Sequence, residues 1–313
     1  MMDLPTIQNA ALLKSALEGL NSTPKSLESK WFYDNAGSHL FEEITELEEY
    51  YPTRTELAIL TDNASLLEKY VPAASVLVEL GSGASRKTRV LLDQFTQLAA
   101  YLPTDISGPF LNQVAQQLRH DYPRLIIDPI VADFTSPIPL HAKYVDTAKT
   151  AFFPGSTLGN LSRDDAISLL SRIRKWNNVT GFILGVDLVK DTQILLDAYN
   201  DAQGITADFN LNLLHRMNRE IGAVFDVDKF EHEARWNDVA SRIEMYLVSL
   251  SDQSVPIGSE EIRFSKGETI HTENSRKYTR ESLSEMAALS GWGVSEFLTD
   301  ADNLFAVAVL TPA

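Results

Sequence analysis

The feature that most constrains the fold is a short apolar run ending in two glycines, VLVELGSGASRK at residues 76–87. Residues 75–80 have the pattern of a fully buried strand, which Gly81 and Gly83 end. Apolar spacing over 88–98 predicts a helix directly after this turn. A buried strand, a glycine turn and a helix in this order are typical of an α/β sheet in which the backbone of the turn approaches a ligand.

The same alternation continues through the middle of the chain. Further strands are predicted at 98–107, 124–134, 150–157 and 181–189, and helices at 110–118 and 164–176. Strands separated by helices of this length indicate a parallel sheet covered on both faces. A helix at 280–289 and strands at 294–298 and 304–310 are expected to complete this sheet.

Between these two parts the pattern changes. Two adjacent helices are predicted at 191–202 and 207–220, followed by strand-like runs at 224–236, 242–250 and 260–264. In the run at 242–250, alternate residues fall on one apolar face. We therefore expect an α+β unit inserted into the sheet domain. The predicted division is 55–190 plus 277–313 for the sheet domain and 1–54 plus 191–276 for the second domain.

The composition of the chain limits which binding partners and which cellular compartment we expect for the protein. The chain has 313 residues, 44% of them hydrophobic, and no run near the roughly 18 apolar residues of a membrane span. Its formal charge of −16 disfavours nucleic acid and anionic membranes as partners. It has no cysteine, and its six histidines lack metal-ligand spacing, so no metal is expected. The start of the chain does not have the pattern of a signal peptide, which favours a cytoplasmic protein.

Acidic residues stand where a bound nucleoside needs them. Asp105 ends the second predicted strand at close to the roughly 20-residue spacing from Gly81 at which a carboxylate binds ribose hydroxyls. Asp133 ends the third strand, where a carboxylate meets the adenine amino group. A nicotinamide enzyme is the rival, but its fingerprint needs a third glycine where this chain has Arg86. The pattern therefore favours S-adenosylmethionine (SAM) and a methyltransferase.

Several longer strings add a resemblance to a known family. They are KWFYDNAGSHLFEEIT (30–45), EYYPTRTE (49–56), ELGSGASRKTR (79–89), FPGSTLGNL (153–161), LGVDLVKD (184–191), AYNDAQGITADFN (198–210), FEHEARWN (230–237) and HTENSRKY (271–278). From about residue 25 onward, the chain closely resembles the histidine-specific methyltransferases of ergothioneine biosynthesis. That family uses three SAM molecules to convert L-histidine to its Nα-trimethyl betaine, hercynine. The resemblance implies a Rossmann-like class I methyltransferase sheet with an inserted α+β substrate-binding domain, in a monomer.

The resemblance also implies the site residues. The cofactor-binding positions are Gly81, Lys87, Asp105, Asp133 and Phe134. The substrate-binding positions are Tyr50, Asn160, Tyr199, Met245, Glu273 and Ser275, and the catalytic positions are Tyr33 and Asn160. In these roles Glu273 accepts the imidazole N–H and Ser275 bonds the other ring nitrogen. Tyr33 and Tyr50 supply aromatic walls for an amine that becomes cationic as methyl groups accumulate.

Residue by residue, these assignments have ordinary structural alternatives. Without the resemblance, Lys87 is a solvated lysine, and Tyr33 and Tyr50 are core aromatics. Asn274 departs from the family, in which we expect a β-branched apolar residue. If its side chain reaches the ring, the substrate is another amino acid, such as a tryptophan derivative, or the methyl group goes to a ring nitrogen. A catalytically silent module that only binds the cofactor is the remaining alternative.

Overall fold

The computed structural model describes residues 8–313 of the chain. These residues form two units, which we call the sheet unit (51–190 and 275–313) and the insert unit (8–50 and 191–274). The chain therefore passes between the units at 50/51, 190/191 and 274/275, whereas the predicted divisions are 54/55, 190/191 and 276/277. The prediction that the chain starts without a signal peptide rests partly on residues 1–7, which lie outside the described residues.

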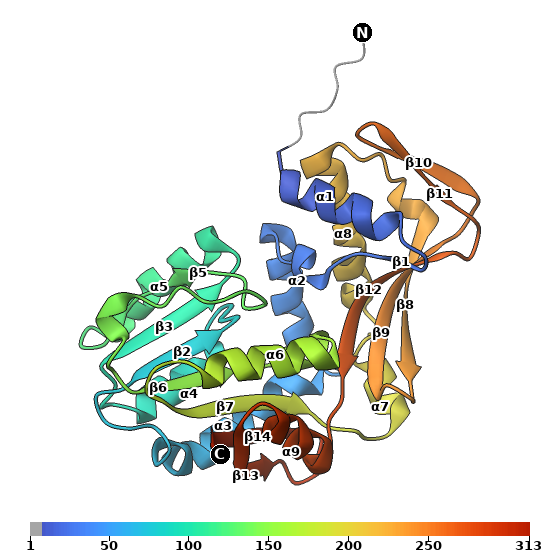
Figure 1. The fold of residues 1–313 in the computed structure, drawn as a ribbon. Helices are drawn as coiled ribbons and strands as arrows, with labels where there is room; N and C mark the ends of the chain where they lie inside the picture. Colours follow the sequence, from blue (N-terminus) through green and yellow to red (C-terminus); the bar gives the residue numbers. More distant parts are fainter. Residues whose placement is uncertain (1–7) are drawn as a thin grey trace. The chain divides into compact units, whose positions relative to one another are not determined.

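The sheet unit is built on one eight-stranded sheet (Figure 1). Its strands are β2 (Val76–Leu80), β3 (Ala100–Asp105), β4 (Ile126–Ile127), β5 (Ile130–Val131), β6 (Lys149–Phe153), β7 (Val179–Asp187), β13 (Trp292–Thr299) and β14 (Phe305–Pro312). They lie in the order β13–β14–β7–β6–β2–β3–β4, with β5 also beside β3. Pairs from β4 to β7 are parallel, whereas β14 runs antiparallel to both β7 and β13. The two C-terminal strands complete the sheet, as predicted.

Helices cover both faces of this sheet. They are α3 (Tyr51–Glu68), α4 (Arg86–Gln94) and α5 (Gly108–Asp121) on one face, and α6 (Arg163–Arg174) and α9 (Arg280–Leu289) on the other. Short 3-10 turns also occur, at η2 (Ala142–Tyr144) and η3 (Thr157–Asn160). Successive residues of β14 pack on opposite faces: Val307 joins the core under α3 and α4, and Ala308 joins the core under α6 and α9. The predicted Rossmann-like α/β class is confirmed.

The insert unit combines helices with two antiparallel pairings. Its helices are α1 (Ala10–Leu20), α2 (Asn35–Thr45), α7 (Thr192–Asp197) and α8 (Ile205–Ile221), with 3-10 turns η1 (Ser29–Phe32) and η4 (Val227–Lys229). Its strands are β1 (Lys25–Ser26), β8 (Phe230–Asn237), β9 (Arg242–Ser249), β10 (Gln253–Ile257), β11 (Glu260–Phe264) and β12 (Thr269–Arg276). The larger sheet has the order β1–β12–β9–β8, and β10 pairs with β11 as a hairpin. α8 packs against α1, α2 and β8.

Several predicted elements are wrong in extent, and three strands were not predicted. The strand expected over 124–134 is two short pieces, β4 and β5, because Pro129 lies between them and has no N–H for the ladder. Asp133 therefore stands two residues beyond β5 rather than at a strand end. The helix expected over 191–202 is only α7, and Gly204, with φ of +77°, precedes the next helix. β1, β10 and β12 are the strands that were missed.

The order of strands in the sheet unit locates a ligand-binding edge. From β2 the chain moves outward to β3 and β4, and then returns to the other side of β2 to form β6 and β7. In open α/β sheets, ligands bind outside the carboxyl ends of the strands where the order reverses in this way. The segments that follow β2, β3 and β6 are therefore the place to look for a site.

No helix within residues 8–313 combines the length and the apolar content needed to cross a bilayer.

Candidate active site

The glycine turn after β2 is joined to the end of β3 through Asp105. Gly81 and Gly83 have φ of +62° and +48°, which side-chain-bearing residues rarely adopt. The Gly83 N–H donates to Asp105 Oδ2 at 3.0 Å, and the Ser107 N–H donates to Asp105 Oδ1 at 2.9 Å. Burial raises the pKa of Asp105, although these backbone N–H groups oppose the rise. One half-buried carboxylate thus organises both turns at the edge where a ligand is expected.

The geometry of this turn fits an adenosyl group. No atom lies within 4 Å of the position that a Cβ would occupy on Gly83, so the backbone there faces open space. At Gly81, the nearest atom to such a Cβ is Cε1 of Phe134, at 3.6 Å. Phe134 also stacks edge-on against Phe153 at the end of β6, with ring centroids 5.1 Å apart. The turn is therefore open on one side and bounded by an aromatic ring on another, as a nucleoside requires.

Asp133 has a local partner in the described structure. Its Oδ1 accepts from both the backbone N–H and the hydroxyl of Thr135, at 2.8 and 2.6 Å. These contacts leave Oδ2 as the oxygen for the predicted bond to adenine. Next to it, the carbonyl of Phe134 accepts from Arg172 Nη2 at 2.9 Å, which ties this loop to α6.

The side chain of Lys87 is part of an ion pair and not a solvated lysine. Its Nζ lies 2.5 Å from Oε2 of Glu56, a fully buried residue of α3. The same Oε2 accepts from the backbone N–H of Gly155, in the loop after β6, at 2.8 Å. Glu56 therefore fixes the ammonium of a predicted cofactor residue and the loop that leads to Asn160. Sequence reasoning did not select Glu56, although it stands inside the EYYPTRTE string.

Replacing Gly185 by alanine is expected to break this anchor. An added Cβ on Gly185 would lie 1.9 Å from Glu56 Oε1 and 2.8 Å from its Cδ. Because Oε2 is held by Lys87 and Gly155, the carboxylate can move only by losing those bonds. We expect Gly185→Ala to lower the free energy of unfolding by about 1–3 kcal/mol, the usual cost of overpacking, and to raise the KM for SAM.

Gly181→Ala is the matched control for that substitution, because it lies on the same strand and its added Cβ meets no atom nearer than 3.5 Å. Urea unfolding of the two variants measures the difference. Equal stability of the two would show that Glu56 is free to move.

A second buried carboxyl, Glu79, lies beneath the glycine turn. Its Oε2 accepts from the hydroxyl of Thr88 at 2.6 Å and from the hydroxyl of Tyr101. The Tyr101 hydroxyl lies 3.0 Å from Ser85 Oγ. Burial raises the pKa of Glu79 to about 8, against the lowering effect of its hydroxyl partners. This carboxyl is therefore mostly protonated at neutral pH, and it links β2 to the start of α4.

Glu79→Gln is expected to flatten the pH dependence of stability. Because the folded pKa is raised, the contribution of Glu79 is fully present below its unfolded value near 4.3 and is lost as pH rises through about 8. Between pH 5 and 9, the variant should therefore gain about 4 kcal/mol relative to the natural chain. Thermal unfolding at both pH values measures this. Glu285→Gln, on the exposed side of α9, is the control, and parallel profiles for Glu79→Gln and the natural chain would contradict the assignment.

Asn160 is carried by the 3-10 turn η3, which packs closely on the backbone of Arg276. An added Cβ on Gly159 would lie 2.6 Å from the Arg276 carbonyl oxygen, so only glycine permits this approach. At the start of the turn, Ser156 Oγ accepts from the backbone N–H of Asp187 at 2.9 Å. Asn160 and Ser275, both predicted substrate residues, are each one residue from the contact between Gly159 and Arg276.

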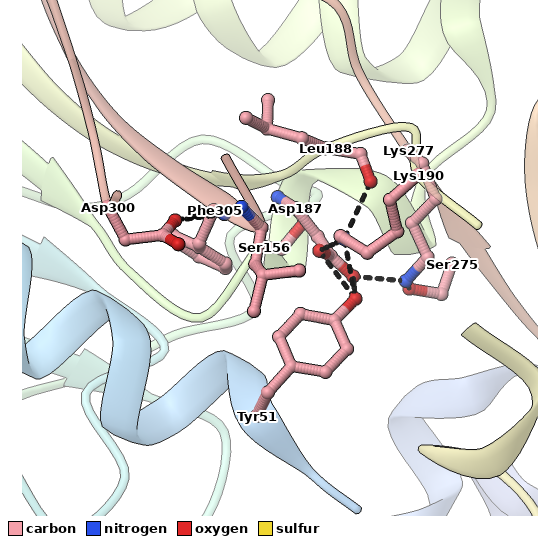
Figure 2. Close-up of polar contacts among 10 residues, drawn as sticks. Tyr51, Ser156, Asp187, Leu188, Lys190, Ser275, Lys277, Asp300 and Phe305 are labelled. Carbon is pink, nitrogen blue, oxygen red and sulfur yellow. Dashed lines mark hydrogen bonds and ion pairs between the residues drawn. The ribbon is translucent and has the colours of Figure 1, made fainter. Parts of the chain in front are cut away.

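Asp187 is the centre of a buried polar cluster at the end of β7 (Figure 2). Its carboxylate accepts from the Tyr51 hydroxyl at 2.8 Å and pairs with Lys190 Nζ at 2.5 Å and Lys277 Nζ at 2.7 Å. Burial raises the pKa of Asp187, but the two ammonium groups outweigh burial and hold it below its usual range. Lys277 also donates to Ser275 Oγ at 2.9 Å. We call Tyr51, Asp187, Lys190 and Lys277 the Asp187 cluster.

The insert unit holds the predicted aromatic residues in one group. Tyr33 meets the rings of Phe41 and Phe209 edge-on, each at 5.8 Å between centroids. Tyr50 meets Phe41 at 6.3 Å and Tyr199 at 6.4 Å, also edge-on. The structure therefore brings Tyr33, Tyr50 and Tyr199 together around shared phenylalanines. Their use as pocket walls stays a prediction.

Hydrogen bonds behind Tyr199 fix its backbone. His232 Nε2 lies 2.8 Å from the Tyr199 carbonyl oxygen, and His232 Nδ1 lies 2.8 Å from Nδ2 of Asn210. Since the amide of Asn210 donates, the ring carries its proton on Nε2 and donates it to Tyr199. Burial lowers the pKa of His232, which favours this neutral form.

Strands β9 and β12 carry the remaining substrate residues. Met245 is buried, and its carbonyl accepts from the hydroxyl of Thr272 at 3.1 Å. Glu273 follows in β12 and is 9% exposed. Asn274 Oδ1 lies 3.0 Å from His271 Nε2. The Asn274 side chain is therefore bonded to a histidine of its own strand, and by strand alternation His271 shares the face of Glu273. The effect of Asn274 on ring specificity stays a prediction.

The sheet unit thus carries the predicted cofactor residues with Asn160 and Ser275, and the insert unit carries Tyr33, Tyr50, Tyr199, Met245 and Glu273. Sequence reasoning missed the Asp187 cluster and Glu56. Asp187, Lys190 and Lys277 stand inside the LGVDLVKD and HTENSRKY strings, but no local pattern distinguishes them from surface charges. Among residues 8–313, no group of three or more His, Cys, Asp or Glu side chains has the arrangement of a metal site.

Comparisons with known proteins agree with this geometry. The family described as "Histidine-specific methyltransferase, SAM-dependent" matches residues 12–312. The histidine N-alpha-methyltransferases of Mycolicibacterium smegmatis and Mycobacterium tuberculosis are 40% and 38% identical, each over 96% of this chain and 94% of the relative. Ergothioneine biosynthesis protein 1 of Neurospora crassa is 29% identical over 86% of this chain and 31% of its own length. The chain therefore belongs to the family of histidine-specific, SAM-dependent methyltransferases.

Proposed function

We propose that this chain transfers methyl groups from SAM to the α-amine of L-histidine, three times in succession, to form hercynine, the first step of ergothioneine biosynthesis. The observation that carries the proposal lies in the sheet unit. There, the glycine turn joined to Asp105 and the turn that bears Asn160 follow neighbouring strands at the edge where the strand order reverses. A methyl donor and an amine acceptor can therefore meet at one edge. The two mycobacterial relatives carry the name of this activity.

Different cofactor-binding residues bind the adenosine and the methionine portions of SAM. Asp105 accepts from the ribose hydroxyls, and Asp133 accepts from the adenine amino group. Gly81 gives the backbone its close approach, and Phe134 packs beside the turn. Lys87, fixed by Glu56, provides a cation for the carboxylate of the methionine portion. When bound, SAM supplies an electrophilic methyl group on its sulfonium.

The substrate-binding residues hold histidine at both ends. The amide of Asn160 binds the α-amine and carboxylate, and the Tyr199 hydroxyl donates to the carboxylate. Glu273 and Ser275 bind the two ring nitrogens, and Met245 lines the pocket. Only a neutral amine has the lone pair needed for attack, so each transfer requires the loss of one proton, either through Tyr33 or a pocket water or directly to solvent before the amine binds. Catalysis rests mainly on proximity and alignment.

We place this reaction in a monomer in the cytoplasm. The absence of cysteine suits a reducing compartment, and every predicted site residue is supplied by one copy of the chain.

Incubation of the protein with SAM and each of the twenty amino acids, read by mass, tests the proposal. We expect histidine alone to gain three methyl groups, all on the α-nitrogen by fragmentation. Methylation of tryptophan in preference to histidine, or of a histidine ring nitrogen, would establish the rival reaction. Binding of SAM with no product from any amino acid would indicate a silent binding module.

Glu273→Ala is expected to weaken histidine binding and leave SAM binding unchanged. A hydrogen bond to a charged group contributes about 1.5–3 kcal/mol, so the Kd for histidine should rise by about 10- to 100-fold. Calorimetry with each ligand measures the two constants separately. Glu231→Ala, an exposed glutamate of β8 in the same unit, is the control and should leave both constants unchanged. Equal weakening of both ligands by Glu273→Ala would remove its assigned role.

A further inference from the structure

Lys277 is a buried cation that the proposed function does not use. Its side chain is fully buried, with Nζ 2.7 Å from Asp187 Oδ2 and 2.9 Å from Ser275 Oγ. An ammonium group has donors and no acceptor. In the contact with Ser275, the serine oxygen therefore accepts, and the hydroxyl proton points away from Lys277. Figure 2 shows this contact beside the Asp187 carboxylate.

The rest of the Asp187 cluster holds Lys277 in place. Asp187 also accepts from Tyr51 and pairs with Lys190, and three separate segments of the sheet unit supply the four residues, since only Asp187 and Lys190 are near neighbours in sequence. The side chains of Asp187 and Lys277 are 1% and 0% exposed. Turning Lys277 toward another partner would leave a buried charge unpaired, which costs several kcal/mol. A rigid, charged neighbour thus keeps the Ser275 oxygen as an acceptor and directs the hydroxyl proton away from Lys277.

We propose that Lys277 is a positioning residue that makes Ser275 a hydrogen-bond donor to the unprotonated ring nitrogen of the substrate. This inference rests on the proposed function and deepens it. Glu273 and Ser275 are two residues apart in β12, so their side chains share one face of the strand. A carboxylate beside a hydroxyl that donates matches a ring with one N–H and one lone pair, which is neutral imidazole in a single tautomer.

The same arrangement discriminates against other side chains. The indole ring of tryptophan has an N–H donor and no nitrogen acceptor. It would offer no acceptor to the Ser275 hydroxyl, and sites built for a specific hydrogen bond reject ligands that lack it. Imidazolium carries two N–H groups and no lone pair. One of its N–H groups would point at the Ser275 hydroxyl, whose oxygen already accepts from the Lys277 ammonium. Lys277 therefore contributes to ring specificity without touching the substrate.

A double-mutant cycle with Lys277→Met and Ser275→Ala tests this coupling. We expect Lys277→Met to raise the KM for histidine about fivefold to tenfold, with kcat and the Kd for SAM within twofold of the natural chain. In the Ser275→Ala background, the same change should raise the KM by less than twofold. Effects that multiply, or an equal loss of SAM binding, would overturn the inference.

Lys190→Met is the matched control, because it removes the other lysine from Asp187, and the Lys190 ammonium donates to Tyr51, Asp187 and the Leu188 carbonyl. It should lower stability and leave the KM for histidine unchanged. If it raises the KM as much as Lys277→Met does, general disruption of the cluster explains the effect and the inference fails.

A second measurement uses the natural chain and does not depend on how Lys277→Met folds. A histidine analogue with a pyrrole ring keeps the N–H and replaces the other nitrogen by C–H. The natural chain should bind histidine at least about tenfold more tightly than this analogue, and Ser275→Ala should bind both within twofold. Equal binding by the natural chain would refute a donating Ser275. A natural chain that does not methylate histidine at all would instead refute the proposed function.

Discussion

Replacing Asp187 by asparagine is expected to lower the free energy of unfolding by about 3–5 kcal/mol, the usual cost of removing one partner from a buried ion pair. Asp187 is 1% exposed and balances two lysines whose side chains are 0% and 6% exposed. Asparagine keeps the shape but removes the charge, so two buried ammonium groups would face each other without a counter-ion. The charged form of Lys190 is already destabilised by burial in the natural chain, because burial lowers its pKa to about 8 despite the attraction of Asp187.

Urea unfolding followed by circular dichroism measures the loss. Asp191→Asn is the matched control, because Asp191 is an exposed residue that caps α7 through the Gln193 N–H, and asparagine caps a helix about as well as aspartate, so stability should be nearly unchanged. Adding Lys277→Met to Asp187→Asn removes one of the two ammonium groups that have lost their counter-ion. This double variant should therefore regain part of the stability. A loss below about 1 kcal/mol for Asp187→Asn would show that water reaches the cluster.

The same cluster predicts a response to acid. The folded pKa of Asp187 is lowered, so its contribution is present above its unfolded pKa near 3.9 and is lost as pH falls through the folded value. The natural chain should therefore lose stability below about pH 4, and Asp187→Asn should show a shallower acid dependence. Thermal unfolding between pH 3 and 6 checks the two slopes against each other.

The buried strands of the sheet unit were predictable because both of their faces meet helices. VLVEL in β2 and FILGV in β7 are predominantly apolar runs without alternation, which a half-exposed strand does not show. β12 was missed for the opposite reason. Its sequence after Ile270, HTENSR, is polar, yet Thr272, Glu273 and Ser275 are buried. Local patterns cannot reveal that a polar strand is buried, because the partners that make its burial tolerable lie elsewhere in the chain.

The site residues also differ in whether a local sequence pattern could reveal them. Asp105 was predictable from its place at a strand end, and the structure joins it to the glycine turn through Gly83. Lys87 followed only from the resemblance, because its partner Glu56 lies 31 residues away on another helix. Asp187 and Tyr51 are 136 residues apart and meet only in the folded sheet unit. Long-range pairing of charges is decided by topology, so sequence spacing gives no sign of it.

Asp105→Asn is expected to have the largest effect on activity, through the loss of SAM binding. In the proposed complex its carboxylate receives hydrogen bonds from both ribose hydroxyls while it also accepts from the Gly83 and Ser107 N–H groups. Asparagine turns one acceptor oxygen into an NH₂ donor, which must face either a backbone N–H or a ribose hydroxyl. Hydrogen bonds to a charged group contribute about 1.5–3 kcal/mol each, so loss of two should weaken SAM by at least about 100-fold.

Calorimetry with SAM, and kcat/KM for SAM at saturating histidine, measure this loss. Asp121→Asn is the matched control, since Asp121 belongs to the same unit and pairs with Arg89 at the surface, 2.7 Å away. It should change neither value by more than twofold.

The pH dependence of SAM affinity separates a role of Asp105 in binding from a role in folding. Because burial raises the pKa of Asp105, SAM affinity of the natural chain should fall on acidification as this carboxylate is protonated. The asparagine variant has no such proton to gain, so its weak affinity should be flat with pH. SAM binding by Asp105→Asn within threefold of the natural chain would mean that the ribose is held by other groups, and that Asp105 serves only to join the turn after β2 to the turn after β3.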